Sequence, residues 1–99
     1  MALLVADLQT GFTADAVVIL VDGTEVLRRE GVSTDFSIGR ADSVEVDAAG
    51  GRVTVEVRVP TQGISGETTF DVGDTPCVGV SSEDGKIEFR LSKEMFVYF

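Results

Sequence analysis

The chain lacks histidine, asparagine and tryptophan, and its 99 residues include one cysteine, Cys77. Without histidine there is no Ser-His-Asp or Cys-His catalytic arrangement and no histidine ligand for a metal. A single cysteine excludes an intrachain disulfide and a thiolate zinc cluster. Free cysteines behave as small hydrophobic residues, so we expect Cys77 to be buried and unreactive. These absences predict a protein that is not an enzyme and holds no cofactor.

Long apolar runs and basic residues are also scarce. The apolar run Ala16–Val21, which no other run of the chain exceeds in length, is far shorter than the roughly 20 residues that span a membrane. The chain has 8 Lys and Arg against 17 Asp and Glu, and therefore a net charge of −9. This charge disfavours nucleic acid and anionic membranes as partners, because both are bound through cationic side chains. The N-terminus shows no basic segment of a secretory signal, which predicts a cytoplasmic protein.

Residues that favour β-strands are abundant, with 16 valines and nine threonines against six leucines. β-branched side chains suit a pleated sheet better than a helix. Eleven glycines interrupt the chain, and no long stretch keeps a helical apolar period. Since 43% of the residues are hydrophobic, the chain can bury a core, and we expect residues 1–99 to form one all-β domain.

Alternation of apolar and polar residues locates the strands. In Arg52–Val59 the four valines point to one face and the polar residues to the other, and Lys86–Leu91 repeats the pattern. Ser43–Asp47 and Thr68–Val72 are shorter versions. Ala16–Val21 is apolar on both faces, which predicts a central, covered strand.

Turn signals separate these segments. Asp22-Gly23 and Asp84-Gly85 each predict a two-residue hairpin turn. Pro60–Gly66 is the longest irregular stretch, and Pro60 is expected to end a strand. The pattern predicts an antiparallel two-sheet β-sandwich of about seven to nine short strands, with a small β-barrel as the alternative. The predicted core comprises Val17, Ile19, Val21, Phe36, Val44, Val46, Val53, Val55, Val57, Phe70, Val72, Val78, Val80, Ile87, Phe89 and Leu91.

A small-ligand site is one hypothesis for function. Within Pro60–Gly66, the side chains of Thr61, Gln62 and Ser65 can hydrogen-bond a sugar or a peptide, and loops on a rigid scaffold commonly carry recognition residues. Calcium is a second ligand to consider, because it prefers oxygen ligands. Its candidate ligands are the acidic turn residues Asp22, Glu25, Asp71, Asp74, Glu83 and Asp84, although Asp before Gly is also typical of a plain turn. A hydrolase that uses a carboxylate pair is a further alternative, for which no spacing selects a pair.

The segment Phe36–Arg40 resembles the start of a forkhead-associated domain, in which a Gly-Arg pair precedes the loops that read phosphothreonine. The resemblance extends from Phe36 to Asp47 and implies a sandwich of eleven strands. The family's Ser-x-x-His motif and a later asparagine are missing here, since the chain contains neither His nor Asn. We therefore expect Arg40 to be a surface or ion-paired arginine.

The chain ends in five consecutive apolar or aromatic residues, Met95, Phe96, Val97, Tyr98 and Phe99. Such a segment either covers the core of its own domain or pairs with a partner chain by strand addition. The N-terminal run Leu3–Val5 can act in the same way. The sequence therefore predicts a non-catalytic binding or assembly module. Its partner is a protein, with a second copy of the chain as one candidate, and its contact is a sheet edge or the C-terminal segment.

Overall fold

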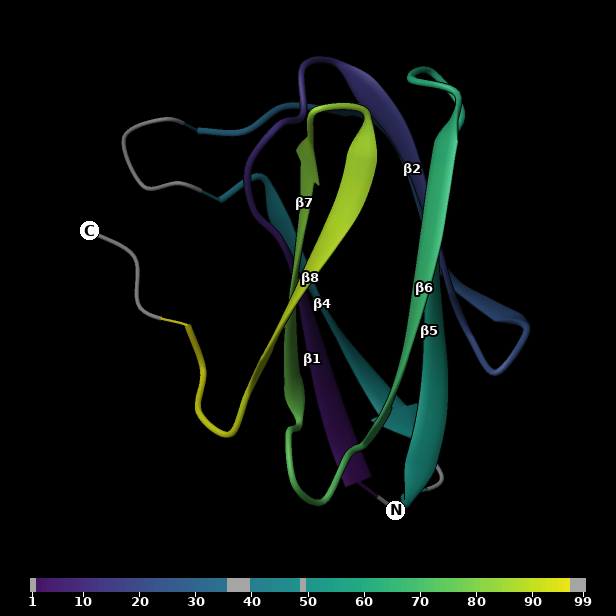
Figure 1. The fold of residues 1–99 in the computed structure, drawn as a ribbon, viewed down its shortest axis with the longest axis vertical. Coiled ribbons are helices and arrows are strands. Elements are labelled where there is room, and N and C mark those ends of the chain that lie inside the picture. Colours follow the sequence, from purple (N-terminus) through teal and green to yellow (C-terminus); the bar gives the residue numbers. More distant parts are fainter. Residues whose placement is uncertain (1, 36–39, 49, 97–99) are drawn as a thin grey trace.

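A computed structural model of the chain contains two sheets of four strands packed face to face (Figure 1). The structure describes residues 2–35, 40–48 and 50–96. In spatial order, sheet A contains β4 (Asp42–Ala48), β1 (Ala2–Leu8), β7 (Cys77–Glu83) and β8 (Lys86–Ser92). Sheet B contains β3 (Thr24–Val32), β2 (Asp15–Val21), β5 (Arg52–Val59) and β6 (Ile64–Asp71).

The predicted two-sheet β-sandwich is confirmed, and the alternative of a small barrel is wrong, because no backbone pairing joins the two sheets in the described parts of the chain. Neighbouring strands are antiparallel except β1 and β7, which are parallel. No helix long and apolar enough to cross a membrane occurs in residues 2–35, 40–48 and 50–96.

The two predicted hairpin turns form as expected. Asp22 and Gly23 have φ values of 49° and 82°, and Asp84 and Gly85 have values of 51° and 75°. A type I′ turn requires a positive φ at both central residues, which glycine adopts without steric cost and aspartate tolerates. These turns join β2 to β3 and β7 to β8.

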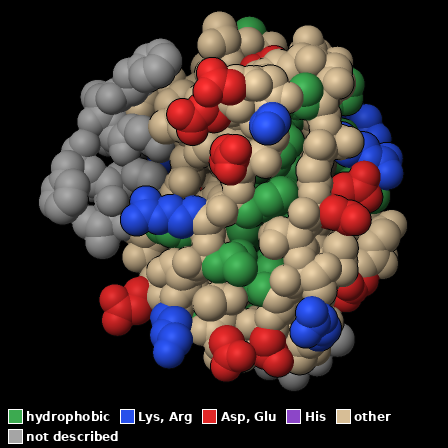
Figure 2. Space-filling view, viewed as in Figure 1, with side chains coloured by type: hydrophobic (Ala, Val, Ile, Leu, Met, Phe, Trp, Pro, Cys, Tyr) green, Lys and Arg blue, Asp and Glu red, His purple; other side chains and the backbone are tan. Residues whose placement is uncertain are grey.

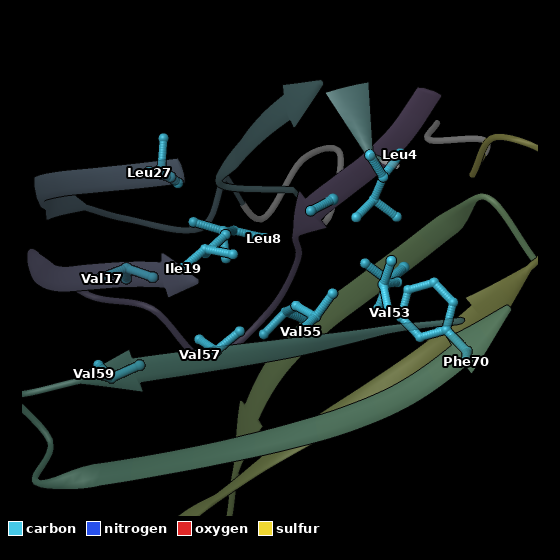
Figure 3. Packing of buried hydrophobic residues seen from close by; sticks show 14 of the residues in the cluster. Leu4, Leu8, Val17, Ile19, Leu27, Val53, Val55, Val57, Val59 and Phe70 are labelled. Atoms are coloured by element: carbon cyan, nitrogen blue, oxygen red, sulfur yellow. The ribbon is translucent and has the colours of Figure 1, made fainter. Parts of the chain in front are cut away.

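The core lies between the sheets and is built mainly from small branched side chains. All four valines of β5 are buried, and Figure 3 shows them together with Leu4 and Leu8 of β1 and Ile19 of β2. Alternation along Arg52–Val59 therefore predicted the inward face correctly. As predicted for Ala16–Val21, β2 is an interior strand of its sheet, with β3 and β5 on either side.

The N-terminal run Leu3–Val5 belongs to an interior strand of sheet A. β1 lies between β4 and β7, pairing with β4 over Ala2–Leu8 and with β7 over Val5–Leu8. Leu4, Ala6 and Leu8 are fully buried, while Leu3 points outward. These pairings leave little free backbone at Leu3–Val5 for a second chain and so count against strand addition there.

The segment Pro60–Gly66 is not a long loop. As expected β5 ends at Val59, but β6 begins at Ile64, so only a tight turn of residues 60–63 connects them. The amide N–H of Gly63 donates to the carbonyl of Pro60 at 3.1 Å, which closes this turn. The strand that contains most of the predicted segment Thr68–Val72 therefore begins four residues earlier, at Ile64.

One member of the predicted core is on the surface, since Leu91 is 40% exposed. Alternation places Leu91 on the inner face of β8, but β8 is the last strand of its sheet, so no further strand of the described chain lies beside it. Some predicted core residues are only partly buried against the core, namely Val21, Val44, Val46, Ile87 and Phe89. Phe36 lies outside the described residues.

We predict that Val55→Ala lowers the free energy of unfolding by about 2–3 kcal/mol, because it leaves a cavity where the side chain is fully buried. Urea denaturation measures this change. The control is Leu3→Ala, at a side chain that is 51% exposed, which should cost less than about 1 kcal/mol. Equal effects of the two changes would contradict the assignment of the core.

Candidate functional site

The sandwich has two lateral sides, each bounded by one terminal strand from each sheet. The side bounded by β6 and β8 has apolar residues at its surface. β6 is the last strand of sheet B and β8 the last strand of sheet A, and the two strands are in contact. Ile64, Ile87 and Phe89 are half-buried there, and Leu91 is exposed. Figure 2, which views this side, shows hydrophobic side chains at the surface between β8 and β6. We call this region, with the outward backbone edges of both strands, the open edge.

The sheets approach closely at the open edge because Gly66 has no side chain. Gly66 lies opposite Val57 of β5, so its missing side chain would point into the sandwich. A Cβ atom at Gly66 would lie only 2.9 Å from the Cβ atom of Ile87 and 3.4 Å from the ring of Phe89. The side chains of β8 therefore fill the space left by the glycine in β6.

The opposite side of the sandwich, bounded by β3 and β4, also has half-buried valines, Val26, Val44 and Val46, but an ion pair joins its two strands. Arg29 of β3 and Asp42 of β4 form an ion pair with 3.3 Å between Nε and Oδ2. Arg28 is paired with Glu25 on the same strand at 2.6 Å. Charged side chains on a terminal strand disfavour pairing with another chain. β8 also has exposed charged side chains, but no ion pair described by the structure joins β6 to β8, and Leu91 is exposed beside them. The open edge is in these two respects the less protected side.

The predicted ligand residues Thr61 and Gln62 bind the domain itself. The Thr61 hydroxyl donates to Oδ1 of Asp15 at 2.6 Å, and the Gln62 side-chain amide donates to Oδ2 at 2.8 Å. The amide N–H of Thr13 donates to Oδ2 at 2.9 Å. Asp15 is a buried residue at the start of β2. The turn of residues 60–63 is therefore fastened to β2.

This polar network also reaches the hairpin of β7 and β8. The Ser82 hydroxyl donates to Oε1 of Gln62, so one side chain links the turn before β6 to the end of β7. Gln62 also donates to the carbonyl of Gly11 at 3.0 Å. Because these contacts hold the two hairpin ends together, they fix the spacing of β6 and β8 at one end of the open edge. We call Asp15, Thr61, Gln62 and Ser82 the Asp15 network.

Hydrogen bonding decides the ionisation of Asp15. Burial alone raises the pKa of a carboxyl group, because the charged form loses hydration. The bonds from Thr61, from the Thr13 amide and from Gln62 stabilise the carboxylate, and together they outweigh burial and lower the pKa of Asp15 below its usual value. Asp15 is therefore a carboxylate at neutral pH.

The third predicted ligand residue, Ser65, is separate from the other two. It belongs to β6 and lines a shallow, open depression with Glu56, Gly66 and Glu67. Glu56 and Glu67 lie directly opposite each other on β5 and β6, but Glu56 is paired with Arg58 at 2.6 Å. This depression is too open to enclose a substrate between its two carboxylates.

Three of the six acidic residues predicted as calcium ligands have a structural role in turns, namely Asp22, Asp71 and Asp84. Oδ1 of Asp22 accepts the amide N–H of Thr54 at 2.9 Å, and Oδ1 of Asp71 accepts that of Gly73 at 2.8 Å. Asp84 occupies a turn position with positive φ. No group of three or more acidic or cysteine side chains suited to a metal ion occurs in the part of the chain that the structure describes.

Cys77 is buried, as predicted, beside Val5 of β1 on sheet A. Burial raises the pKa of the thiol, and the neighbouring carboxylate of Asp7 raises it further. Asp7 is itself buried and accepts a hydrogen bond from the hydroxyl of Ser43 at 2.6 Å. The thiol is therefore protonated at neutral pH, the less nucleophilic form.

The described part of the C-terminal segment leaves the sandwich after β8. Met95 is 65% exposed. Phe96 is half-buried, and its ring centroid lies 5.5 Å from the guanidinium carbon of Arg90, a cation–π contact. The predicted interface residues Val97, Tyr98 and Phe99 lie outside the described residues, as do residues 36–39. Met95 and Phe96 are not among the residues that form the core.

Comparisons of the chain with protein-family models, with curated proteins and with solved structures found no match. The resemblance of Phe36–Arg40 to forkhead-associated domains thus gains no support from them. Arg40 is half-buried, and its carbonyl accepts the amide N–H of Asp35 at 3.1 Å. Function must be inferred from the surface of the chain itself.

We predict that Asp15→Asn lowers the free energy of unfolding at pH 7 by about 1–3 kcal/mol, because an amide nitrogen would face the donors of Thr13 or Gln62. The lowered pKa of Asp15 stabilises the fold above the pKa of the unfolded chain, about 3.9, and this stability is lost as the pH falls through the lower folded value. The difference between the two proteins should therefore shrink in acid.

Urea denaturation from pH 7 to pH 3 measures this difference. The control is Asp47→Asn, at an exposed residue of β4, which should change stability by less than about 0.5 kcal/mol at any pH in the series. A constant difference between wild type and Asp15→Asn across the series would show that the carboxylate charge does not stabilise the network.

Proposed function

We propose that the chain is a non-catalytic assembly module that contacts a protein partner through the open edge. The observation that carries this proposal is the contrast between the two sides of the sandwich. One side has an ion pair between its terminal strands, from Arg29 to Asp42. The other presents half-buried apolar residues and the exposed Leu91 beside the outward edges of β6 and β8, along which no further strand lies in the described part of the chain.

The edge of a sheet can bind a protein through backbone hydrogen bonds. A terminal strand has backbone N–H and C=O groups that point away from its sheet, and an added strand satisfies them in register. The apolar side chains beside that edge add hydrophobic burial, which a partner supplies when it covers Ile87, Phe89 and Leu91. A protein partner also suits the net charge of −9 better than nucleic acid or a membrane does.

The C-terminal segment is a second candidate contact, favoured by the exposure of Met95. The small-ligand hypothesis is less well supported. Thr61 and Gln62, which a sugar or peptide would use, already donate to Asp15, while Asp22 and Asp71 accept backbone amides. A carboxylate-pair hydrolase would need a deeper site than the depression at Glu56.

We predict that the chain self-associates as its concentration rises and that Leu91→Lys abolishes this association. A lysine there places a charge where an apolar contact should form. Light scattering of the solution mass measures the effect. Two matched variants are Leu3→Lys, on the outer side of β1, and Met95→Lys, in the C-terminal segment, and both should associate as the wild type does.

The three variants separate the two candidate contacts. If Met95→Lys abolishes association and Leu91→Lys does not, the C-terminal segment is the interface and the open edge is not. If the wild type stays monomeric at every concentration, or if all three variants behave alike, the proposed assembly through this edge is wrong. Circular dichroism confirms that each variant is folded.

A further inference from the structure

The side chains of β8 divide into two sets on its two faces. Ile87, Phe89 and Leu91 are on the inner face, where Ile87 and Phe89 pack against the core. Lys86, Glu88 and Arg90 are exposed on the outer face. None of these three charged side chains takes part in an ion pair described by the structure, where the paired cations are Arg28, Arg29 and Arg58. Arg90 lies against the ring of Phe96, a contact that does not neutralise its charge, so the outer face of β8 has charges of both signs without an ion-pair partner among the described residues.

Building on the proposed use of the open edge, we infer that its partner is β8 of a second copy of the chain, paired antiparallel about a two-fold axis at Phe89. Residues directly opposite each other in an antiparallel pair lie on the same face of the sheet. This axis places Glu88 of each copy opposite Arg90 of the other, and Ile87 opposite Leu91. Phe89 faces its own equivalent.

Charge and length select this register over its neighbours. An axis at Glu88 would set two glutamates against each other and Lys86 against Arg90, and an axis at Arg90 would set two arginines against each other. Like charges directly opposite are destabilising. An axis at Ile87 would run the pairing into the turn at Asp84, which has a positive φ. Phe89 is the midpoint of Lys86–Ser92, so its register alone pairs the whole strand.

The other terminal strands are less suited to pairing with themselves. The outer face of β4 has Glu45 and Asp47 and no cation, so two copies would repel each other. On β3, Arg28 and Arg29 are already paired within the chain. The one charged side chain inside β6 before its last residue is Glu67, which has no cation beside it on that strand.

The positions of the few cationic residues in this acidic chain also favour β8 as the pairing strand. Both lysines of the sequence, Lys86 and Lys93, lie in β8 or directly after it, together with Arg90. Two copies that each carry a net charge of −9 therefore repel least along this strand. The pairing would make one continuous sheet in the order β4-β1-β7-β8-β8-β7-β1-β4 and would end at the acidic edges of β4, so the assembly closes as a dimer.

A charge-exchange experiment tests the register. Glu88→Arg alone sets two arginines against each other across the axis, and Arg90→Glu alone sets two glutamates against each other. Each variant should dimerise at least about tenfold more weakly than the wild type, as measured by sedimentation or light scattering. In an equimolar mixture, the arginine that replaces Glu88 faces the glutamate that replaces Arg90. The mixture should therefore dimerise about as strongly as the wild type.

Two variants control for net charge. Lys86→Glu changes the charge by the same amount as Arg90→Glu, but Lys86 faces the neutral Ser92 in this register. Glu45→Arg changes the net charge by the same amount as Glu88→Arg, but it lies on β4, at the other end of sheet A. Both should dimerise within about threefold of the wild type.

The outcomes separate this inference from the proposed function. If the wild type dimerises and Leu91→Lys prevents it, but mixing the two charge variants restores nothing, the open edge is the interface and the Phe89 register is wrong. If the mixture recovers while Lys86→Glu and Glu45→Arg stay near wild type, the register is confirmed. If the wild type never dimerises, both the register and the proposed assembly are overturned.

Discussion

A sheet that does not close on itself has two terminal strands whose outward N–H and C=O groups lack partners, and this constraint shapes the whole sandwich. Two four-stranded sheets create four such edges, and the chain treats them unequally. An ion pair joins β3 to β4, and acidic side chains line β4. β6 and β8 instead meet through apolar side chains, which leaves their edges suitable for another strand.

The Asp15 network gives the open edge a fixed shape at one end. Asp15 begins β2, Gln62 lies just before β6, and Ser82 lies near the end of β7. The bonds among them connect the hairpins that contain the two terminal strands, one from each sheet. Because the strands of the open edge are already held in position, they lose less conformational entropy when a partner binds. The residues expected to hold a ligand therefore support the surface proposed to hold a protein.

Local patterns in the sequence predicted much of the fold. Alternation marked the inward faces of β5 and β8, and the Asp-Gly pairs marked two hairpins, because both signals depend on neighbouring residues. Alternation says which face a residue is on, but not where its strand lies in the sheet. For this reason Leu91 was expected in the core and the central position of β1, paired in parallel with the distant β7, was missed.

The candidate sites were harder to predict because they depend on contacts across the chain. Thr61 and Gln62 lie 46 and 47 residues from Asp15, so no local pattern shows that their hydrogen bonds are already used. Ile87 and Phe89 pack against the core, as alternation predicts, and they also border the open edge. Apolar Ile87 and Phe89 alternate with charges of both signs, which also suits a strand that pairs with its own copy.

Amide hydrogen exchange of β8 at rising protein concentration tests the central claim most directly. In a β-strand, successive N–H groups point to opposite sides, so every second amide of Lys86–Ser92 faces the open edge. If β8 pairs with a second copy, those amides should exchange more slowly as the concentration rises, while the outward amides of β3 and β4 should be unchanged. Exchange in β8 that is independent of concentration, or protection that appears at β3 and β4 instead, would contradict the claim.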